Sequence, residues 1–404
     1  MLIKIAWRNI WRNKTRSLVV IGSIIVGVWA LLAGTGFMNG FMVSYSADMI
    51  EHDISNLQVH HPDFKTDFDI KYYLPDAIEK AEELRVWPGV SGVTTRMISN
   101  GMVSSPQKAG AVQIRGIDPE NEAIVTGIDS MLIEGTYFED VKRNPVIIGS
   151  KMAENLKVKL RSKIVLTFTD GNGDVTAGAF RIVGIIKSSS ISINELYAFV
   201  KQEDITRLFG INGEAHELAI LTEKQFDEDL ILNKYQAEYP NDKIESWREI
   251  APELEFMQEM YANMLYILMA IIMIALIFGI VNTMLMAVLE RSKELGILMA
   301  IGLNKMRVYF MIVIETIFLA LIGAPIGLAI GALNISLYME KGVDLSNYSE
   351  GLEAFGYSSI LYPYLEASVY PIVTIAVFIT AIIAALYPAY KAIKLKPVEA
   401  IHSI

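Results

Sequence analysis

The chain has 404 residues, of which 52% are hydrophobic and 20% are charged, with a mean hydropathy of +0.37 and a formal net charge of −10. This hydropathy indicates a membrane protein, but a chain lying wholly in the bilayer would not hold so many charges, so we expect a water-soluble part as well. The absence of cysteine excludes disulfides, cysteine-ligated zinc and thiol catalysis, and leaves the redox compartment open.

The first 17 residues combine positive charge with a pattern typical of a membrane surface. They hold five basic side chains, no acidic one, and two tryptophans suited to the headgroup layer: Lys4, Arg8, Arg12, Lys14, Arg16, Trp7 and Trp11. We predict a cytoplasmic amphipathic helix over 1–17 and an uncleaved membrane span over 18–42. The apolar run is longer than the core of a signal peptide, and no A-x-A-like site ends it.

Residues 43–262 contain no spanning segment and are acidic. They carry 36 acidic and 22 basic side chains, whereas the remainder of the chain carries 9 and 13. Because positive charge favours the cytoplasmic side of a membrane, we predict that both termini are cytoplasmic and that residues 43–262 form a large extracytoplasmic domain.

This domain shows two strand–helix–strand patterns separated by an insert. The patterns, in 43–108 and 213–248, predict one α/β subdomain, and the insert, 109–212, predicts a β-rich subdomain. The expected strands are Ile54–His61, Val93–Val103, Ala111–Gly116, Val146–Gly149, Lys163–Thr169, Val175–Ile186, Glu217–Leu221 and Lys243–Trp247. The expected helices are Asp76–Val86, Glu223–Glu238 and Glu249–Tyr261, the last running into the second span.

The pair His60 and His61 beside Asp63 has two interpretations. A metal site would need further ligands, which the sequence does not offer nearby. The end of a strand running into Pro62 explains the same residues and is favoured, so no metal is expected.

Residues 170–174, DGNGD, begin like a calcium-binding loop. The match then fails, because Val175 and Arg181 stand where that loop needs Gly and Glu. A Gly/Asn hairpin tip between two strands is the favoured interpretation. Whether the hairpin, 170–176, contacts a partner stays open.

Three further apolar runs predict membrane spans at 263–289, 308–336 and 369–390, each long enough to cross a bilayer as a helix. A link at 290–307 and a basic tail at 391–404 would lie in the cytoplasm, and residues 337–368 would form an outer loop. The predicted fold class is therefore an α+β membrane protein. It has four transmembrane helices plus a large extracytoplasmic α/β domain with an inserted β-rich subdomain.

Two polar residues lie inside the predicted spans. Asn282 precedes Glu290 by eight residues and Glu315 follows Arg307 by eight, so both lie about 12 Å into the membrane at 1.5 Å per residue. A carboxylate facing lipid is costly, so Glu315 should face the protein interior. We predict a hydrogen bond between Asn282 and Glu315. In the alternative, each side chain finds another partner, including one in a second chain.

Small residues recur every four positions in two of the spans. They are Ala275, Gly279, Thr283 and Ala287 in the second span, and Gly323, Gly327 and Gly331 in the third. Such stripes let helix backbones approach closely. Packing within one chain and a seam between two chains explain them equally well.

The strip Glu290–Gly302, ERSKELGILMAIG, joins the second and third spans and is amphipathic. Leu295, Leu298, Met299 and Gly302 recur at helical spacing, and charges cluster at the start. The apolar face needs a surface to bury it. Charges of mixed sign favour a cytoplasmic protein partner over lipid.

Motifs of self-contained catalysis do not occur in the sequence. G-x-x-x-x-G-K-[ST], G-x-S-x-G and H-E-x-x-H are all absent. Asn282 and Glu315 alone would make a poor proton relay. We therefore expect a non-catalytic chain with no cofactor of its own.

The layout and three motifs resemble the FtsX/macrolide-exporter superfamily of ABC-transporter permeases. The motifs are the opening W-R-N-x-x-R-N-K-x-R-S, the central ERSKELGILMAIG and the ending YPAYKAIKLKPVEAI. The resemblance covers the whole chain and implies that Glu290–Gly302 is a coupling helix docked in a separate cytoplasmic ATPase subunit, which would bind ATP and Mg. The implied coupling residues are Glu290, Arg291, Glu294, Leu295, Gly296, Leu298, Met299, Ala300 and Gly302. The resemblance also implies a Porter-like α/β subdomain and a Sabre-like β-rich insert.

Within this superfamily, Met38–Phe41 is similar to the MNGF stretch of lipoprotein-releasing permeases. In that type, two permease chains and two ATPases extract acylated lipoproteins from the bacterial inner membrane and pass them to a periplasmic carrier. The resemblance implies a vestibule for acyl chains built from Met38, Asn39, Phe41, Tyr261, Met264, Leu265 and Leu268. Packing or lipid-facing roles explain the same positions. Membrane lipid is an expected partner and nucleic acid is not.

Two other functions of the superfamily compete with lipoprotein release. A macrolide-exporter-like permease would drive a periplasmic adaptor, and a division-type scaffold would activate cell-wall hydrolases. The outer domain of about 220 residues is large for the scaffold. The MNGF stretch and the lack of an ATPase motif in this sequence disfavour the exporter. The substrate, the periplasmic partner and the choice between homodimer and heterodimer stay open.

Overall fold

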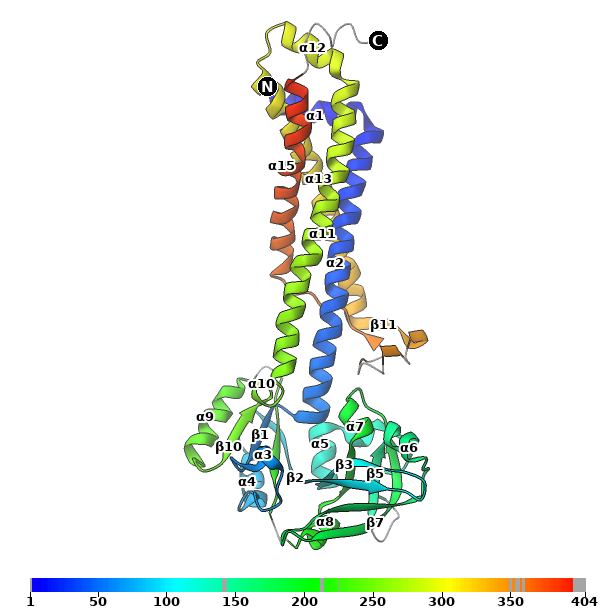
Figure 1. Cartoon of the computed structure of the whole chain (residues 1–404). Coiled ribbons are helices and arrows are strands. Elements are labelled where there is room, and N and C mark those ends of the chain that lie inside the picture. Colours follow the sequence, from blue (N-terminus) through cyan, green and yellow to red (C-terminus); the bar gives the residue numbers. More distant parts are fainter. Residues whose placement is uncertain are drawn as a thin grey trace. The chain divides into compact units, whose positions relative to one another are not determined.

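The computed structural model describes residues 2–139, 144–210, 214–224, 226–348, 351–352, 357 and 360–394. The chain divides into two compact units (Figure 1). The helical unit comprises Met1–Val43, Gln258–Asp344 and Ile360–Ile404, and the sheet unit comprises Ser44–Met257 and Leu345–Ser359. Two of the passages between the units lie within continuous helices, α2 and α11.

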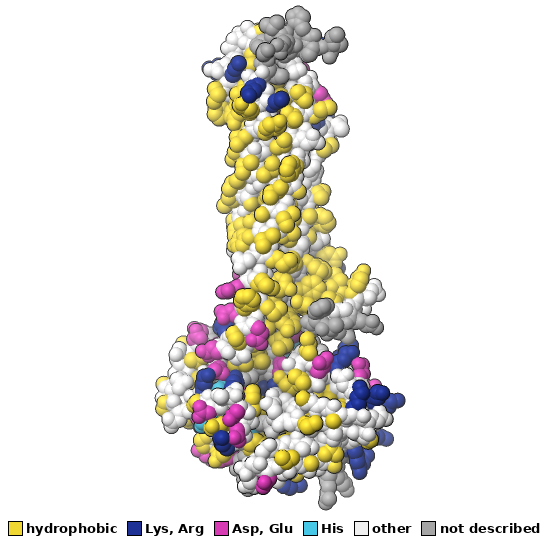
Figure 2. Space-filling model, viewed as in Figure 1, with side chains coloured by type: hydrophobic (Ala, Val, Ile, Leu, Met, Phe, Trp, Pro, Cys, Tyr) yellow, Lys and Arg dark blue, Asp and Glu magenta, His cyan; other side chains and the backbone are white. Residues whose placement is uncertain are grey.

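Among the described residues, four helices are long and apolar enough to cross a membrane, as predicted. They are α2 Lys14–Met49, α11 Pro252–Glu290, α13 Lys305–Lys341 and α15 Val369–Ile393. Each continues past the apolar run that predicted it, because helical hydrogen bonding extends into the polar flanks. Figure 2 shows hydrophobic side chains covering this bundle.

Shorter elements complete the helical unit. Helix α1 Leu2–Arg12 is separated from α2 by Asn13 alone, so the helix expected over 1–17 ends at Arg12. Helix α12 Ser292–Ala300 joins α11 to α13, and strands β11 Val343–Asp344 and β12 Ile360–Leu361 pair with each other. The tail predicted at 391–404 lies outside the described residues after Lys394.

The glycines of α13 account for its close contact with α2. Added Cβ atoms would lie 3.0 Å from Ile24 Cβ at Gly323, 2.9 Å from Val28 Cβ at Gly327, and 2.6 Å from Leu32 Cδ1 at Gly331. Because real side chains do not fit at such distances, the third-span stripe packs within this chain. Gly279 of the second-span stripe instead faces open space, so a seam with a second chain stays open there.

The sheet unit is built on a ten-stranded sheet in the order β10-β1-β9-β2-β3-β8-β5-β7-β4, with β6 paired to β2 and β7. The strands are β1 Leu57–His60, β2 Val90–Ser104, β3 Ala109–Ile117, β4 Leu132–Gly135, β5 Pro145–Gly149, β6 Lys163–Thr169, β7 Val175–Ile186, β8 Tyr197–Lys201, β9 Glu217–Thr222 and β10 Lys243–Ser246. The α-helices are α3 Phe64–Asp67, α4 Ala77–Leu84, α5 Pro119–Thr126, α6 Ser150–Leu156, α7 Ile191–Glu195, α8 Gln202–Phe209, α9 Glu228–Glu238 and α10 Trp247–Ile250. The 3-10 turns are η2 Ile128–Met131 and η3 Ser346–Tyr348, and α2 continues into the π-turn η1 Ile50–Ile54. This mixed α/β unit and the four candidate spans confirm the predicted fold class.

The 15-residue strand β2 joins the two halves of this sheet. Its first half pairs with β9, and its second half pairs with β3 and β6. One core, around Leu218 and Tyr235, lies beside the first half, and another, around Ile114 and Phe180, lies beside the second. The sheet is therefore continuous through the predicted α/β subdomain and its insert.

The predicted hairpin tip is confirmed. Strands β6 and β7 have the predicted bounds, and the Asp170 carboxylate between them accepts hydrogen bonds from the backbone N–H of Asn172 at 2.9 Å and of Asp174 at 3.0 Å. Gly173 adopts φ +86°, in the region that favours glycine. Hydrogen bonds from the Asp174 and Asn172 backbones lower the pKa of the Asp170 carboxyl.

The strand end predicted at His60 is also confirmed. His60 is the last residue of β1, and its Nε2 lies 2.8 Å from Oε2 of Glu245 in the neighbouring strand β10. The His61 ring stacks on Tyr72, with the ring centroids 5.1 Å apart.

Candidate functional site

The predicted coupling segment folds as helix α12, and Arg291 fixes this helix to the bundle. Arg291 stands at the break between α11 and α12. Its Nη1 lies 3.2 Å from Oε1 of Glu315 in α13, and its Nη2 donates to the carbonyl of Asn9 in α1 at 3.0 Å. Both charged side chains are buried. One guanidinium therefore connects the start of α12 to two other helices.

The predicted hydrogen bond between Asn282 and Glu315 is wrong. Glu315 is bound by Arg291, and the exposed side chain of Asn282 has no hydrogen-bond partner among the described residues. A buried carboxylate gains more from a cation than from a neutral amide, because the charge–charge attraction is stronger where water is excluded. The sequence alone placed Arg291 in the cytoplasmic link and did not indicate that its side chain is buried in the bundle.

Helix α12 presents one face to its own bundle and another to the outside. Leu295 and Gly296 are buried, and Met299 packs against the same core. These three residues therefore hold the helix against its own bundle, and their predicted contact with an ATPase subunit stays a prediction. Leu298 is 39% exposed. Ala300 and Gly302 are exposed, and Gly302 adopts φ +103° as the chain turns towards α13.

Two exposed residues of this segment were missed by the sequence analysis. Ile297 is 47% exposed and Ile301 is 80% exposed, on the same side as Leu298. We call Ile297, Leu298 and Ile301 the outer edge of α12. They were missed because the sequence analysis assigned all the apolar residues of this segment to the one face that carries Leu295, Leu298 and Met299. Together the three side chains of the outer edge form an exposed apolar surface beside the charged start of the segment.

Two ion pairs link the start of this segment to the chain's basic opening. Arg12 pairs with Glu294, and Arg16 pairs with Glu290. The carboxylates of both pairs are half exposed, so these pairs contribute little to stability and mainly set the position of α12.

The predicted vestibule residues lie on two neighbouring antiparallel helices. A Cβ on Gly27 of α2 would meet Leu276 of α11 at 2.8 Å, and one on Gly34 would meet Leu268 at 3.6 Å. From Gly27 to Gly34 the chain advances seven residues along α2, and from Leu276 to Leu268 it goes back eight residues along α11. The two helices are therefore antiparallel and nearly in register. Continuing one turn on each helix brings Met38 level with Met264.

By the same register, Phe41, three residues after Met38, lies level with Tyr261, three residues before Met264. Leu265 and Leu268 are half-buried at this level, and Met264 is 49% exposed. The register therefore places the seven predicted residues on adjacent turns of the helix pair, from Leu268, level with Gly34, to Tyr261, level with Phe41.

The Met38–Phe41 stretch is held by the segment that precedes α15. Tyr364 N–H donates to the carbonyl of Gly36 at 3.0 Å, and Asn39 Nδ2 donates to the carbonyl of Tyr364 at 3.3 Å. A Cβ on Gly40 would lie 2.5 Å from the carbonyl oxygen of Tyr362. Glycine at position 40 is therefore required for this approach, and Asn39 is a positioning residue rather than a free lining residue.

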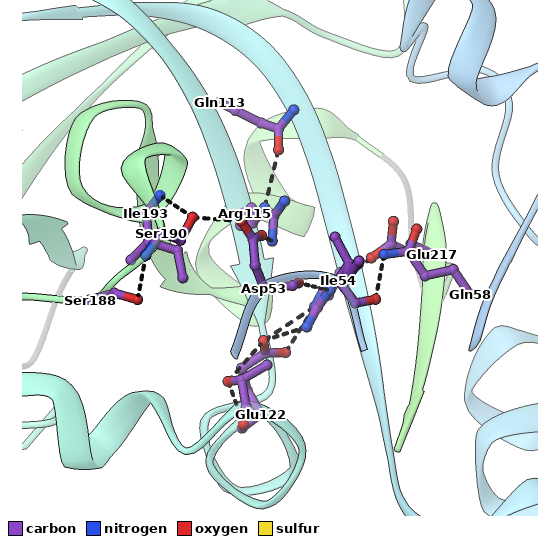
Figure 3. A network of polar contacts seen from close by, with 12 residues as sticks. Asp53, Ile54, Gln58, Gln113, Arg115, Glu122, Ser188, Ser190, Ile193 and Glu217 are labelled. Carbon is purple, nitrogen blue, oxygen red and sulfur yellow. Dashed lines mark hydrogen bonds and ion pairs between the residues drawn. The ribbon is translucent and has the colours of Figure 1, made fainter. Parts of the chain in front are cut away.

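A buried ionic network lies inside the sheet unit, where the π-turn η1 meets the sheet (Figure 3). Arg96 of β2 binds Glu122 of α5 through Nη2 at 2.8 Å and Glu217 of β9 through Nη1 at 2.9 Å. Asp53 of η1 lies 3.4 Å from Nη1 of Arg115 and accepts a 2.7 Å hydrogen bond from Ser190. The network therefore connects η1, which follows α2, to strands in both halves of the sheet.

The opposite charges of this network shift one another's pKa values towards the charged forms. Burial alone would lower the pKa of the Arg96 guanidinium, but the carboxylates of Glu122 and Glu217 outweigh it and raise that pKa. Burial would raise the pKa of Glu217, but Arg96 and Arg115 lower it below its ordinary value. Removal of any one of these charged groups would leave an uncompensated buried charge.

Two family models match the sequence. The family described as FtsX-like permease C-terminal matches residues 266–397, and the family described as MacB-like periplasmic core domain matches residues 17–233. The second match alone spans more than half of the chain. The chain belongs to the FtsX-like permeases with a MacB-like periplasmic core domain. In this chain, α12 connects α11 and α13, the first two long helices of the region that matches the FtsX-like family.

The curated relatives include lipoprotein-releasing permeases and ATP-binding/permease exporters. The lipoprotein-releasing system transmembrane protein LolC of Neisseria meningitidis is 22% identical, over 95% of this chain and 93% of LolC. LolE of Haemophilus influenzae is 21% identical, over 94% of this chain and 92% of LolE. The macrolide export ATP-binding/permease protein MacB of Bdellovibrio bacteriovorus is 23% identical over 96% of this chain but only 59% of MacB. The chain is thus an ABC-transporter permease of the Lol/MacB type.

Proposed function

We propose that this permease couples ATP hydrolysis in a separate ATPase subunit to the extraction of acylated lipoproteins from the bacterial inner membrane towards a periplasmic carrier. The observation that carries the proposal is the end-to-end correspondence with lipoprotein-releasing permeases. The similarity covers 95% of this chain and 93% of LolC. The Met38–Phe41 stretch, shared with that type by resemblance, supports the same choice.

In this proposal the outer edge of α12 binds the ATPase on the cytoplasmic side. The exposure of Ile297 and Ile301 supplies an apolar surface, and the burial of Leu295 makes α12 rigid with the bundle. A displacement of α12 is passed to α1 and α13 through Arg291, whose guanidinium contacts both. ATP can then drive transport only by changing the relative affinity of two bundle conformations for the substrate.

The acyl chains of the substrate would enter at the level of Met38 and Met264. Burial of an acyl chain is worth about 0.8 kcal/mol per CH₂, so moving several chains out of a bilayer needs both an apolar receiving surface and an external energy source. The half-buried Leu265 and Leu268 offer the first, and ATP in the partner subunit offers the second.

Macrolide-exporter-like mechanotransmission is the second candidate. The match of residues 17–233 to the MacB-like periplasmic core domain favours it, as does the 23% identity with MacB itself. In that function the sheet unit would drive a periplasmic adaptor, and no acyl chain would enter the bundle.

Purification of the full chain with the ATPase of its own organism tests the proposal. We expect acylated lipoprotein to co-purify, and a periplasmic adaptor without lipoprotein would overturn the proposal. Leu265→Ser should reduce the bound lipoprotein several-fold. Ile267→Ser is the matched control, because Ile267 lies on the same turn of α11 but is 60% exposed and outside the predicted vestibule. Equal losses in both variants would remove the vestibule from the proposal.

A further inference from the structure

A polar cavity of ≈ 830 Å³ opens between the first turn of α2 and the last turns of α11. Its charged lining comes from Arg12, Lys14, Arg16 and Glu290, and its inner end is formed by Asn282 and Thr283. Asn282 precedes Glu290 by two helical turns, so the cavity reaches about 12 Å inwards from the end of α11 at 1.5 Å per residue. It therefore extends from the basic end of the bundle into the apolar part of α11.

The lining is arranged for an anion. Three cations line the cavity. Arg12 pairs with Glu294 and Arg16 with Glu290, whereas Lys14 makes no ion pair among the described residues. The first turn of α2 adds the positive end of a long helix. Arg16 uses Nη2 to pair with Glu290, whereas its Nη1 is buried and has no hydrogen-bond partner among the described residues. An unpaired buried guanidinium nitrogen is costly, so an acceptor that reaches it would be favoured.

The cavity also has an apolar edge. The cavity lies between α2 and α11, which touch further along the bundle, where a Cβ on Gly27 would meet Leu276. The apolar side chains at its edges are exposed, Val19 by 54% and Met286 by 57%. A ligand that fills both parts must carry an anionic head and an apolar tail.

We propose that this cavity binds an anionic phospholipid, with its phosphate against Arg16 and Lys14 and an acyl chain against the exposed side chains of Val19 and Met286. Basic pockets between membrane helices are the expected binding sites of acidic headgroups. This lipid would be a resident of the headgroup layer at the basic end of the bundle. The inference is independent of the proposed transport function.

Two other occupants fit the observations less well. A water-soluble subunit would not reach Asn282 and Thr283, which lie two turns inside an apolar helix. A second copy of this chain would have to offer a carboxylate to these cations, but Glu290 and Glu294 at this end of the bundle are already paired with Arg16 and Arg12 of their own chain.

Lipid binding to the full chain, delipidated in detergent, tests this proposal by native mass spectrometry. The probes are phosphatidylglycerol and phosphatidylcholine with identical acyl chains. We expect phosphatidylglycerol to be retained at least fivefold more than phosphatidylcholine, and Lys14→Gln to reduce its retention about fivefold, the effect of one basic residue near an anionic headgroup. Lys14 is exposed and makes no ion pair among the described residues, so its replacement should leave folding intact. Asn282→Leu, which fills the polar end with an apolar side chain, should also reduce retention.

The matched control is Lys4→Gln, which removes one exposed positive charge from α1 outside the cavity. It should leave the preference for phosphatidylglycerol unchanged. Equal retention of both lipids, or equal losses in Lys14→Gln and Lys4→Gln, would overturn the proposal. Full displacement of phosphatidylglycerol by equimolar inorganic phosphate would identify a free-phosphate site instead. Displacement by the ATPase subunit would assign the cavity to the protein interface.

Discussion

At the scale of single residues, the buried charges of this protein organise their surroundings. Arg96 joins two carboxylates inside the sheet unit, and Arg291 joins Glu315 to the backbone of α1 inside the helical unit. Each guanidinium contacts elements that are far apart in the sequence. Such contacts cost desolvation and offer geometric specificity, so these arginines define which elements meet rather than supplying large net stability.

Replacement of Arg96 is expected to be strongly destabilising. Arg96→Met leaves Glu122 and Glu217 buried without their cation, which should lower the free energy of unfolding by about 3–5 kcal/mol. The measurement is a urea titration of the full chain in detergent, followed by fluorescence of Trp87 and Trp247 after Trp7, Trp11 and Trp29 are changed to Phe.

The control for this prediction is Lys151→Ala, which breaks the exposed pair with Glu154. It should change the free energy of unfolding by no more than about 0.5 kcal/mol. An Arg96→Met protein as stable as this control would show that the network is dispensable.

His216 predicts a dependence of stability on pH. Its Nδ1 accepts from the Ile98 N–H at 3.0 Å and its Nε2 lies 3.0 Å from the Ile70 carbonyl, and burial lowers the pKa of His216 to about 4. The unfolded chain, with a pKa near 6.5, therefore binds a proton more readily than the native chain. This contribution to stability is present above pH 6.5 and is lost as the pH falls towards 4.

Between pH 7 and pH 5 the loss due to His216 should be about 2 kcal/mol. The same urea titration at both pH values measures it. His216→Gln, which keeps one donor and one acceptor but does not titrate, should reduce the pH dependence by this amount. An unchanged dependence in His216→Gln would assign the acid sensitivity to other groups.

At the scale of elements, the periodicity of apolar residues predicted correctly the helices and strands that have a simple apolar pattern. Strands β6 and β7 and the four long helices fall where alternation and apolar runs placed them. Helix α9 begins at Glu228 rather than Glu223, because the Asp227 side chain caps it by accepting from Asp229 N–H. The two faces of α12 were not separable from the sequence, because both are apolar and only the packing of Leu295 distinguishes them.

The outer edge of α12 is expected to control association with an ATPase subunit. Ile301→Glu and Ile297→Glu should each weaken binding by at least tenfold, since they place a charge on a surface that a partner buries. Affinity can be measured by surface plasmon resonance with the full chain in nanodiscs. Met306→Glu is the control, because Met306 is 52% exposed in the first turn of α13, beyond α12. Equal effects at positions 306 and 301 would contradict docking through this edge.

The glycine stripes separate packing within the chain from contact with another chain. Gly327→Ala should destabilise the bundle by about 1–3 kcal/mol, because its Cβ would lie 2.9 Å from that of Val28. Gly279→Ala should be neutral in the isolated chain, since its Cβ meets nothing within 4 Å. Thermal unfolding in detergent measures both. If Gly279→Ala alone lowers the proportion of dimer, the second-span stripe is a seam between chains, whereas equal destabilisation by both changes would contradict this assignment.

At the scale of the whole molecule, the sequence predicted the number of spans, the two-part composition and the permease family. These follow from composition and long apolar runs, which are properties of whole segments. The partners of buried polar groups could not be predicted, because Arg291 and Asn9 are 282 positions apart and meet only through the folded bundle. The predicted hydrogen bond of Asn282 failed for this reason. It was inferred from the depth of two residues in the membrane, and depth does not tell which side of its helix a residue faces.

ATP-dependent release of lipoprotein tests the central claim most directly. The full chain and the ATPase of its own organism are reconstituted in proteoliposomes with a fluorescent triacylated lipoprotein and a soluble carrier, and transfer to the carrier is followed after ATP is added. We predict transfer that requires ATP and falls at least tenfold with Ile301→Glu while Met306→Glu retains it. Hydrolysis of ATP with no transfer of lipoprotein, but with stimulation by a periplasmic adaptor, would contradict the account.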